Sequence, residues 1–374
     1  MQANWREITA VFSIKNSYVL ATIIDTRGAT YQKMGAMMLI TEQGECFGLL
    51  SGGCLEADIS LHAKQVLLSE KSKIIRYDLS SDADLLWGLG LGCDGAIDIL
   101  LQPLLIKNNH LGFYQLLCDI NSQKTGYFVQ NIPLEILKQL DLNIEFEPFG
   151  EFISSKYINY SMIKDKAIAL QQNSSFIVTP IKPPINLLIC GAGPDVVPVS
   201  ALAWQMGWQV TLWDHRKMHL QEPSFSKYQR QCIRAEDSLL EDYSAFDAAI
   251  VMTHNLAMDS DYLSKLLTTS EKKLSYIGLL GPQSRRDKLL QESGFDSHQV
   301  QSRVYGPVGL NLGGRGAEAI ALSIISEIQQ HFFTNINSNQ NSERSIICCS
   351  DDVEITKALT QISLSNVVNG TEYA

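Results

Sequence analysis

Two cysteines beside glycines are the residues of this sequence best suited to chemistry. Cys54 lies in Ser51-Gly52-Gly53-Cys54-Leu55-Glu56, where a strand pattern gives way to a helical one, and Cys93 lies in the glycine-rich stretch 88–95. Unpaired N–H groups at a helix start favour negative charge, and glycines let a ligand approach the chain closely. Such a turn stabilises a thiolate or a bound anion. The alternative is a small buried thiol, the commoner state of a free cysteine.

The helix and strands around Cys54 are predicted from the spacing of hydrophobic residues. Ile59, Ala63, Val66 and Leu67 recur at the spacing of one helix face, which predicts a helix with Cys54 in its first turn. Strand patterns at 18–24, 36–40 and 96–101 surround this helix, so the first region is predicted to be a mixed α/β domain.

A second constellation follows the apolar run 185–190. Gly191 and Gly193 lie between a predicted strand and a predicted helix from Pro194 to Gln205, and Asp214 ends the next strand. This arrangement is typical of a dinucleotide-binding βαβ unit, in which the glycines receive the pyrophosphate and the acid binds a ribose hydroxyl. Val196 replaces the third glycine of that fingerprint. A tight turn without a nucleotide is the alternative interpretation.

Three further candidates follow later strands. His254 comes just beyond the strand at 247–252, where open α/β sheets form their ligand crevice. Arg285 begins the helix after the strand at 274–280, and an arginine there suggests an anionic ligand. Arg315 lies in the loop 306–316, whose five glycines can wrap an anion or only turn a corner. A structural histidine and simple solvent exposure of the arginines are the alternatives.

Composition restricts the class of protein. The chain has 374 residues, of which 45% are apolar and 19% charged, as in a globular protein of two or three domains. A net charge of -10 without a basic block argues against nucleic acid and anionic membrane as partners. The first residues resemble no signal peptide and no stretch of eighteen apolar residues occurs, so neither secretion nor membrane spanning is expected. Eight scattered cysteines fit a reducing cytoplasm.

Four segments are expected along the chain. An N-terminal α/β domain spans 1–103, and a connecting subdomain with a proline-rich linker spans 104–184. Residues 185–333 alternate strands and helices as a Rossmann-like, doubly wound parallel sheet does, and 334–374 form a poorly specified tail. The predicted fold class is therefore α/β, with a mixed domain followed by a Rossmann-like one.

Taken together, these motifs resemble the XdhC/CoxI family, the maturation factors of molybdenum hydroxylases such as xanthine dehydrogenase and CO dehydrogenase. The motifs that carry the resemblance, in their order along the chain, are Thr26-Arg27-Gly28-Ala29-Thr30, Gly35-Ala36-Met37-Met38, Ser51 to Glu56, Gly88 to Gly95, Gly191-Ala192-Gly193-Pro194-Asp195, Met252-Thr253-His254, Tyr276 to Gly281 and Gly309-Leu310-Asn311-Leu312-Gly313.

The resemblance implies a chaperone rather than a stand-alone catalyst. Such a protein binds molybdenum cofactor (molybdopterin or a dinucleotide form), holds it while a cysteine desulfurase supplies sulfide, and delivers it to an apo molybdenum hydroxylase. Molybdenum prefers sulfur ligands, and the pterin's phosphate demands N–H groups and arginines. The resemblance therefore implies the following roles: Cys54 or Cys93 as sulfur carrier, with Cys54 as the metal ligand, and cofactor contacts by Arg27, Gly52, Gly53, Gly191, Gly193, Asp214, His254, Arg285 and Arg315.

Two other functions remain open at this stage. Gly191, Gly193 and Asp214 suggest an NAD(P)-dependent oxidoreductase. A binding module or scaffold without a small ligand is the third possibility. A homo-oligomer is also compatible with the sequence.

Overall fold

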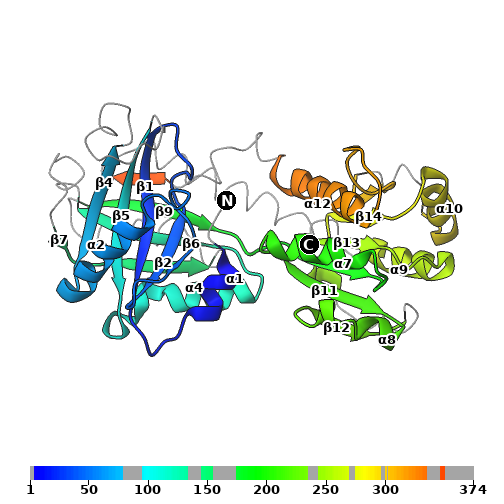
Figure 1. Cartoon of the computed structure of the whole chain (residues 1–374), viewed down its shortest axis with the longest axis horizontal. Helices are drawn as coiled ribbons and strands as arrows, with labels where there is room; N and C mark the ends of the chain where they lie inside the picture. The colour runs from blue at the N-terminus through cyan, green and yellow to red at the C-terminus, as the bar shows by residue number, and fades with distance from the viewer. Residues whose placement is uncertain are drawn as a thin grey trace, which may run out of the picture. The chain divides into compact units, whose positions relative to one another are not determined.

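The chain divides into two compact units. The computed structural model describes residues 4–78, 95–133, 145–154, 174–234, 243–268, 274–295, 300, 302–334 and 346–349. Unit 1 comprises residues 1–183 and 339–374, and unit 2 comprises residues 184–338 (Figure 1). We expected a connecting subdomain at 104–184, and all of it except residue 184 belongs to unit 1 by its contacts, as does the strand at 346–349.

Unit 1 is built on two antiparallel sheets. Sheet A has the order β3-β2-β1-β5-β4-β7, and its strands are β1 (Tyr18–Gly28), β2 (Met37–Thr41), β3 (Cys46–Phe47), β4 (Ser72–Asp78), β5 (Gly95–Leu104) and β7 (Glu145–Phe146). Sheet B has the order β16-β9-β6-β8, and its strands are β6 (Gly126–Pro133), β8 (Gly150–Ser154), β9 (Ser174–Ile181) and β16 (Ile346–Cys349). The helical elements of unit 1 are α1 (Trp5–Val11), α2 (Glu56–Ser69), η1 (Ile106–Gly112) and α4 (Phe113–Asn121).

The two central strands of sheet A, β1 and β5, are buried over most of their length, and most of their buried positions are apolar. On β1, Val19, Ala21 and Ile23 point to the face that α2 covers, where they pack with Ile59 and Ala63. The alternate residues of β1 and β5 face α1, α4 and sheet B, in clusters that include Leu20, Ile24, Leu100, Phe128 and Ile177. This alternation, which follows from the period of two in a strand, places sheet A between two layers.

Unit 2 is a doubly wound parallel sheet. Its order is β12-β11-β10-β13-β14-β15, every pair is parallel, and the strands are β10 (Asn186–Cys190), β11 (Gln209–Asp214), β12 (Gln229–Cys232), β13 (Ala248–Val251), β14 (Tyr276–Leu279) and β15 (Val304–Tyr305). The helical elements of unit 2 are α7 (Val196–Gln205), α8 (Lys217–Leu220), η3 (Pro223–Phe225), η5 (Tyr243–Ala245), α9 (Leu256–Thr268), α10 (Gln283–Ser293) and α12 (Ala317–Phe333). Numbered along this unit, the strand order is 3-2-1-4-5-6, so the chain reverses direction across the sheet between β10 and β13.

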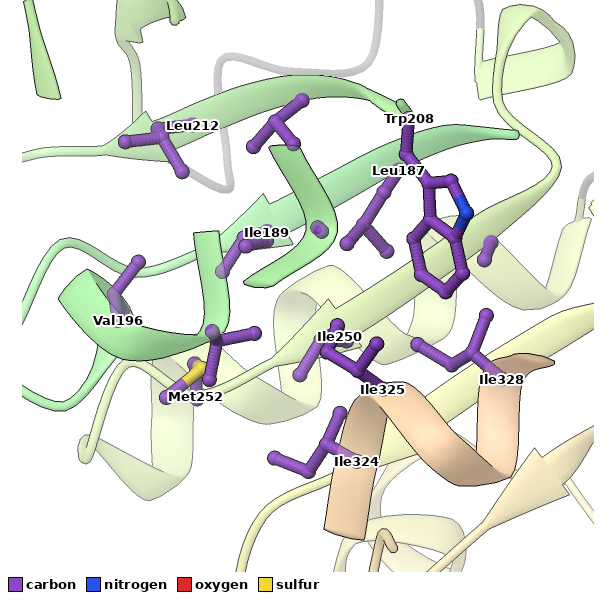
Figure 2. Packing of buried hydrophobic residues seen from close by; sticks show 14 of the residues in the cluster. Leu187, Ile189, Val196, Trp208, Leu212, Ile250, Met252, Ile324, Ile325 and Ile328 are labelled. Atoms are coloured by element: carbon purple, nitrogen blue, oxygen red, sulfur yellow. The ribbon is translucent and has the colours of Figure 1, made fainter. Parts of the chain in front are cut away.

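The core of unit 2 lies on both faces of this sheet. Leu187 and Ile189 of β10 pack with α7 and with Ile324 and Ile328 of α12 (Figure 2). The alternate residues Leu188 and Cys190 pack on the opposite face with α9 and α10. The Rossmann-like architecture predicted for residues 185–333 is therefore confirmed, although the predicted strands and helices differ from the observed limits by one or two residues.

No helix in the described part of the chain is long and apolar enough to cross a membrane.

Candidate functional site

The site residues predicted in unit 1 gather at one end of sheet A. Arg27 and Gly28 end β1, and Gly28 pairs with Gly95 at the start of β5. The first turn of α2 reaches the same end, because the hydroxyl of Tyr77, near the end of β4, donates to Oδ2 of Asp58 at 2.6 Å. Cys93 precedes Gly95 by two residues but lies outside the described residues. The structure thus brings Arg27 and the turn before α2 to one edge of unit 1.

Glu56 holds the turn that contains Cys54. Its carboxylate accepts hydrogen bonds from the N–H groups of Leu50 (3.0 Å) and Ser51 (2.9 Å) and from the Ser51 hydroxyl (2.5 Å). The N–H of Leu55 donates to the Ser51 hydroxyl at 2.8 Å and to Glu56 at 3.2 Å. The backbone groups that flank Cys54 are therefore fixed by a side chain of α2 itself.

Cys54 lies on the exposed tip of this turn. The helix begins at Glu56, so the prediction that Cys54 lies in the first helical turn was wrong by two residues, because Gly52 and Gly53 adopt positive φ angles of 80° and 106° and Leu55 takes the N-cap position. Cys54 is a free and exposed cysteine. Among the described residues, none accepts a hydrogen bond from the N–H groups of Gly52, Gly53 or Cys54. The turn therefore presents a thiol beside three available donors.

The two glycines of the turn have different surroundings. A Cβ atom at Gly52 would lie 3.3 Å from the ring of Tyr31, whereas one at Gly53 would meet nothing within 4 Å. The loop after β1 thus covers one side of the turn, and the side next to Cys54 is open to a ligand.

The ionisation of Glu56 makes the stability of this turn depend on pH. Burial raises the pKa of Glu56, but hydrogen bonds from Ser51 and Leu50 outweigh burial and hold that pKa below its ordinary value of 4.5. The unfolded chain therefore protonates Glu56 more readily than the folded chain does. The stabilisation that ionised Glu56 gives the fold is complete above its ordinary pKa of 4.5 and is lost as the pH falls through its pKa in the folded protein.

We expect the Glu56→Gln variant to lose about 2 kcal/mol of unfolding free energy at pH 7, since it breaks charge-assisted hydrogen bonds. Urea denaturation at pH 7 and pH 4 measures this, and the variant is expected to lose less stability than the wild type on acidification. Glu45→Gln, which changes an exposed acid of unit 1, is the matched control. An equal pH dependence in Glu56→Gln and wild type would contradict this role of Glu56.

Arg27 belongs to a charge cluster on β1, β4 and β5. Asp98 has a nearly buried side chain and accepts a bidentate pair from Arg76, with both distances at 2.6 Å, while Arg27 reaches the same carboxylate at 3.0 Å. The Arg27 side chain remains 49% exposed and also approaches Asp25 at 3.4 Å. Asp25 and Asp98 together balance the charges of Arg27 and Arg76, so what the half-exposed Arg27 offers an anion at this edge is N–H donors rather than surplus charge.

In unit 2 the predicted residues lie at the carboxyl ends of β10, β11, β13 and β14. The reversal of the strand order between β10 and β13 is the switch point at which open α/β sheets bind ligands. Gly191 follows β10 with φ of +136°, and a Cβ atom there would lie 2.5 Å from the carbonyl oxygen of Met252, which follows β13. Only glycine allows this approach between the two strand ends.

The carboxylate of Asp214 bonds the backbone of the glycine turn. It is 1% exposed, and its carboxylate accepts hydrogen bonds from the N–H of Ala192 (2.7 Å) and the guanidinium of Arg216 (2.9 and 2.7 Å). Burial raises the pKa of Asp214, but the bonds from Arg216 and Ala192 outweigh burial and lower it overall. In this structure the Asp214 carboxylate thus holds the glycine turn and Arg216 together, and its contact with a cofactor stays a prediction.

Arg285 has a similar internal role. Its guanidinium donates to the buried carboxylate of Asp259 at 2.6 Å, and the same carboxylate accepts from the N–H (3.1 Å) and hydroxyl (2.6 Å) of Thr253. Arg285 therefore already has an anionic partner within the chain, and an anionic ligand beside it stays a prediction. This pair fixes the segment that carries His254.

The side chain of His254, just after β13, reaches the glycine turn that follows the neighbouring strand β10. Its Nε2 lies 2.8 Å from Oδ2 of Asp195, just after Gly193, and the imidazole is 55% exposed. His254 has a φ of +62°, a left-handed conformation that is uncommon for a residue with a side chain. Arg315, by contrast, is exposed in the glycine-rich loop before α12.

Three acids in these contacts were missed as site residues. Glu56, Asp195 and Asp259 each lie in the first turn of a helix or just before it, a position that favours acids through the helix dipole. That preference was the available signal, but it does not identify the hydrogen-bond partners. Within the described ranges, no group of three or more His, Cys, Asp or Glu side chains could hold a metal ion.

A shallow pocket of about 430 Å³ lies at the other end of sheet A, beside the start of β1 and the end of α2. The residues that line it are Ser17, Glu42, Lys64, Leu67, Leu68, Glu70 and Leu105. It contains none of the predicted site residues.

Comparison with known proteins identifies the family. Residues 15–78 match the XdhC and CoxI family and residues 187–328 match the XdhC Rossmann domain. A Bacillus subtilis (strain 168) protein, named as a probable xanthine dehydrogenase subunit, is 32% identical over 329 residues, which are 86% of this chain and 96% of that protein. The chain belongs to the XdhC and CoxI family.

Two further similarities cover most of this XdhC/CoxI chain. The molybdenum cofactor insertion chaperone PaoD of Escherichia coli (strain K12) is 23% identical over 86% of this chain and 85% of its own length. A crystal structure described as a xanthine dehydrogenase from Bacillus halodurans superposes with a TM-score of 0.71, at 29% identity, over 89% of this chain and 96% of that one. Both units of this XdhC/CoxI chain therefore have counterparts in its relatives.

Proposed function

We propose that this chain is a maturation chaperone for a molybdenum hydroxylase and that its cargo is the molybdenum cofactor. The main support is the similarity over 86% of this chain to PaoD, which is named as a molybdenum cofactor insertion chaperone. The similarity to a probable component of xanthine dehydrogenase supports a hydroxylase of the xanthine dehydrogenase kind as the partner.

The turn before α2 has the groups needed to bind the molybdenum end of the cofactor. The thiol of Cys54 is exposed and has three donor N–H groups next to it, and molybdenum has a strong preference for sulfur ligands. Because the cofactor's own dithiolene supplies two sulfur ligands, one thiolate from the protein is enough, and a cluster of protein ligands is not required. The half-exposed guanidinium of Arg27 offers N–H donors to the anionic parts of the cargo at the same end of sheet A.

In this proposal Cys54 or Cys93 contacts the molybdenum or accepts the outer sulfur of a cysteine desulfurase persulfide, which leaves the desulfurase as a thiol. A second thiol reduces the persulfide formed on the chain, so that sulfide replaces a terminal oxo ligand of the bound cargo and the oxo leaves as water. The cargo is then delivered to the apo hydroxylase. For unit 2 by itself, we propose that the Gly191–Gly193 turn is a site for the phosphate side of a pterin. The glycine turn, its support by Asp214 and its place at the switch point favour this role.

The experiment is to express an apo molybdenum hydroxylase in a cofactor-producing host that lacks its own XdhC-type protein, with and without this chain. We expect active hydroxylase, with molybdenum in the purified enzyme, only when the chain is present. Equal activity and equal molybdenum content in its absence, with each available hydroxylase partner, would contradict the proposal.

A further inference from the structure

The side chain of Asp195 occupies the space that the second glycine of a Rossmann turn leaves for a ligand. In dinucleotide-binding folds that glycine lets the pyrophosphate approach the backbone. Here a Cβ atom at Gly193 would lie 2.6 Å from Oδ1 of Asp195 and 3.7 Å from Cδ2 of His254. The carboxylate of Asp195 therefore lies against the open face of Gly193, where a phosphate oxygen of a bound nucleotide is expected.

His254 holds the carboxylate in this position. Oδ1 of Asp195 lies over Gly193 while Oδ2 bonds Nε2 of His254 at 2.8 Å, so the two oxygens contact the two features that would receive a phosphate. The Asp195 side chain is 26% exposed and the imidazole 55% exposed, so both reach solvent. Rotation of Asp195 about its side-chain bonds would free both Gly193 and His254.

The two arginines near the turn have their hydrogen bonds with other carboxylates, although the charge of Arg216 is close enough to interact with Asp195. Arg216 is committed to the buried Asp214, and Arg285 to the buried Asp259. His254 is the side chain that both hydrogen-bonds Asp195 and lies beside Gly193, so it is placed to bond a ligand's phosphate there. The left-handed backbone of His254 aims the ring across the switch point, from β13 toward the turn after β10.

We propose that Asp195 is a specificity-determining residue, an internal anion that competes with the phosphate of a ligand for Gly193 and His254. A phosphate binds when Asp195 leaves His254, and the imidazole then bonds the ligand instead. This deepens, and rests on, the proposal that the turn receives the phosphate side of the pterin. Because each binding event must break the Asp195–His254 contact, the affinity for phosphate is lowered, which suits a carrier that has to release its cargo. It also disfavours NAD(P), which depends on its pyrophosphate for much of its binding.

The test uses the full chain and inorganic pyrophosphate as the probe, titrated by calorimetry at pH 7 and low salt. Asp195→Asn keeps the size of the side chain and removes its charge, and we expect it to bind pyrophosphate about tenfold more tightly than the wild type. His254→Gln is expected to bind more weakly, and the double variant no more tightly than His254→Gln. Glu292→Gln, which removes one charge at the C-terminal end of α10, is the matched control and is expected to bind like the wild type.

Equal or weaker binding by Asp195→Asn would overturn the inference, as would a gain of the same size in Glu292→Gln or the absence of pyrophosphate binding in every variant. The same proteins, purified from a cofactor-producing host, separate this result from the proposed function. Wild-type protein that carries pterin, together with no gain in Asp195→Asn, contradicts the role of Asp195 alone. Wild-type protein that never carries pterin contradicts the proposed function, whatever the titrations show.

Discussion

Cys54→Ser, combined with Cys93→Ser, is expected to abolish cofactor loading without unfolding the protein. Changes near metal ligands typically reduce metal affinity 10- to 100-fold, so removal of the thiol itself should reduce cofactor retention by at least about a hundredfold. Because Cys54 is exposed and the turn is held by Ser51 and Glu56, the substitution removes no packing. Molybdenum and pterin in the purified protein, together with hydroxylase activation, measure the effect.

The single variants and a control separate the two thiols. Cys232→Ser replaces another free, exposed cysteine, in unit 2, and is expected to retain wild-type loading. If Cys54→Ser alone has the full effect, Cys54 is the working thiolate, and if Cys93→Ser alone has it, Cys93 is. Wild-type loading and activation in the double variant would contradict the role of both.

Gly191→Ala is expected to have the largest effect on stability. The substitution places a methyl group 2.5 Å from the carbonyl oxygen of Met252, in a backbone conformation that residues with side chains rarely adopt. Neither strand end can move without disturbing the β10–β13 pairing, in which Cys190 lies beside Val251. We expect a loss of at least about 3 kcal/mol, a large part of the stability of a domain.

Gly294→Ala is the matched control for this prediction. Gly294 also has a positive φ, +77°, but a Cβ atom there meets nothing within 4 Å, so the expected cost is only about 1 kcal/mol. Chemical denaturation followed by tryptophan fluorescence measures both, since Trp204, Trp208 and Trp213 lie in unit 2. Similar costs for the two variants would show that the contact with Met252 is not the constraint.

The sequence predicted the Rossmann-like unit well because its signals are local. Apolar runs such as 186–190, the Gly191 turn and the stop at Gly207 define one βαβ unit without reference to distant residues. Sheet B of unit 1 could not be predicted in this way. It pairs β9 with β6 and with β16, more than 150 residues away, and such pairings depend on contacts that no local pattern records.

In the candidate site, too, local features could be predicted and long-range contacts could not. Positions of the glycines and of Cys54 and His254 could be predicted because turn chemistry and strand ends are visible in the sequence. The partners of the charged groups could not, since Asp214 meets Arg216, Asp259 meets Arg285 and Asp195 meets His254 only after folding. Those partners show which charges are already paired within the chain: Asp214 and Arg285 each have an internal partner, and their contacts with a ligand stay predictions.

The most direct test of the central claim is the stoichiometry of molybdenum, pterin and nucleotide in the full chain purified from a molybdenum-replete, cofactor-producing host. If the chain carries molybdenum cofactor on these thiols, the wild-type protein contains molybdenum and pterin in a ratio near one to one. The Cys54→Ser, Cys93→Ser double variant loses both. A wild-type chain that binds nicotinamide dinucleotide tightly and carries neither molybdenum nor pterin would contradict it.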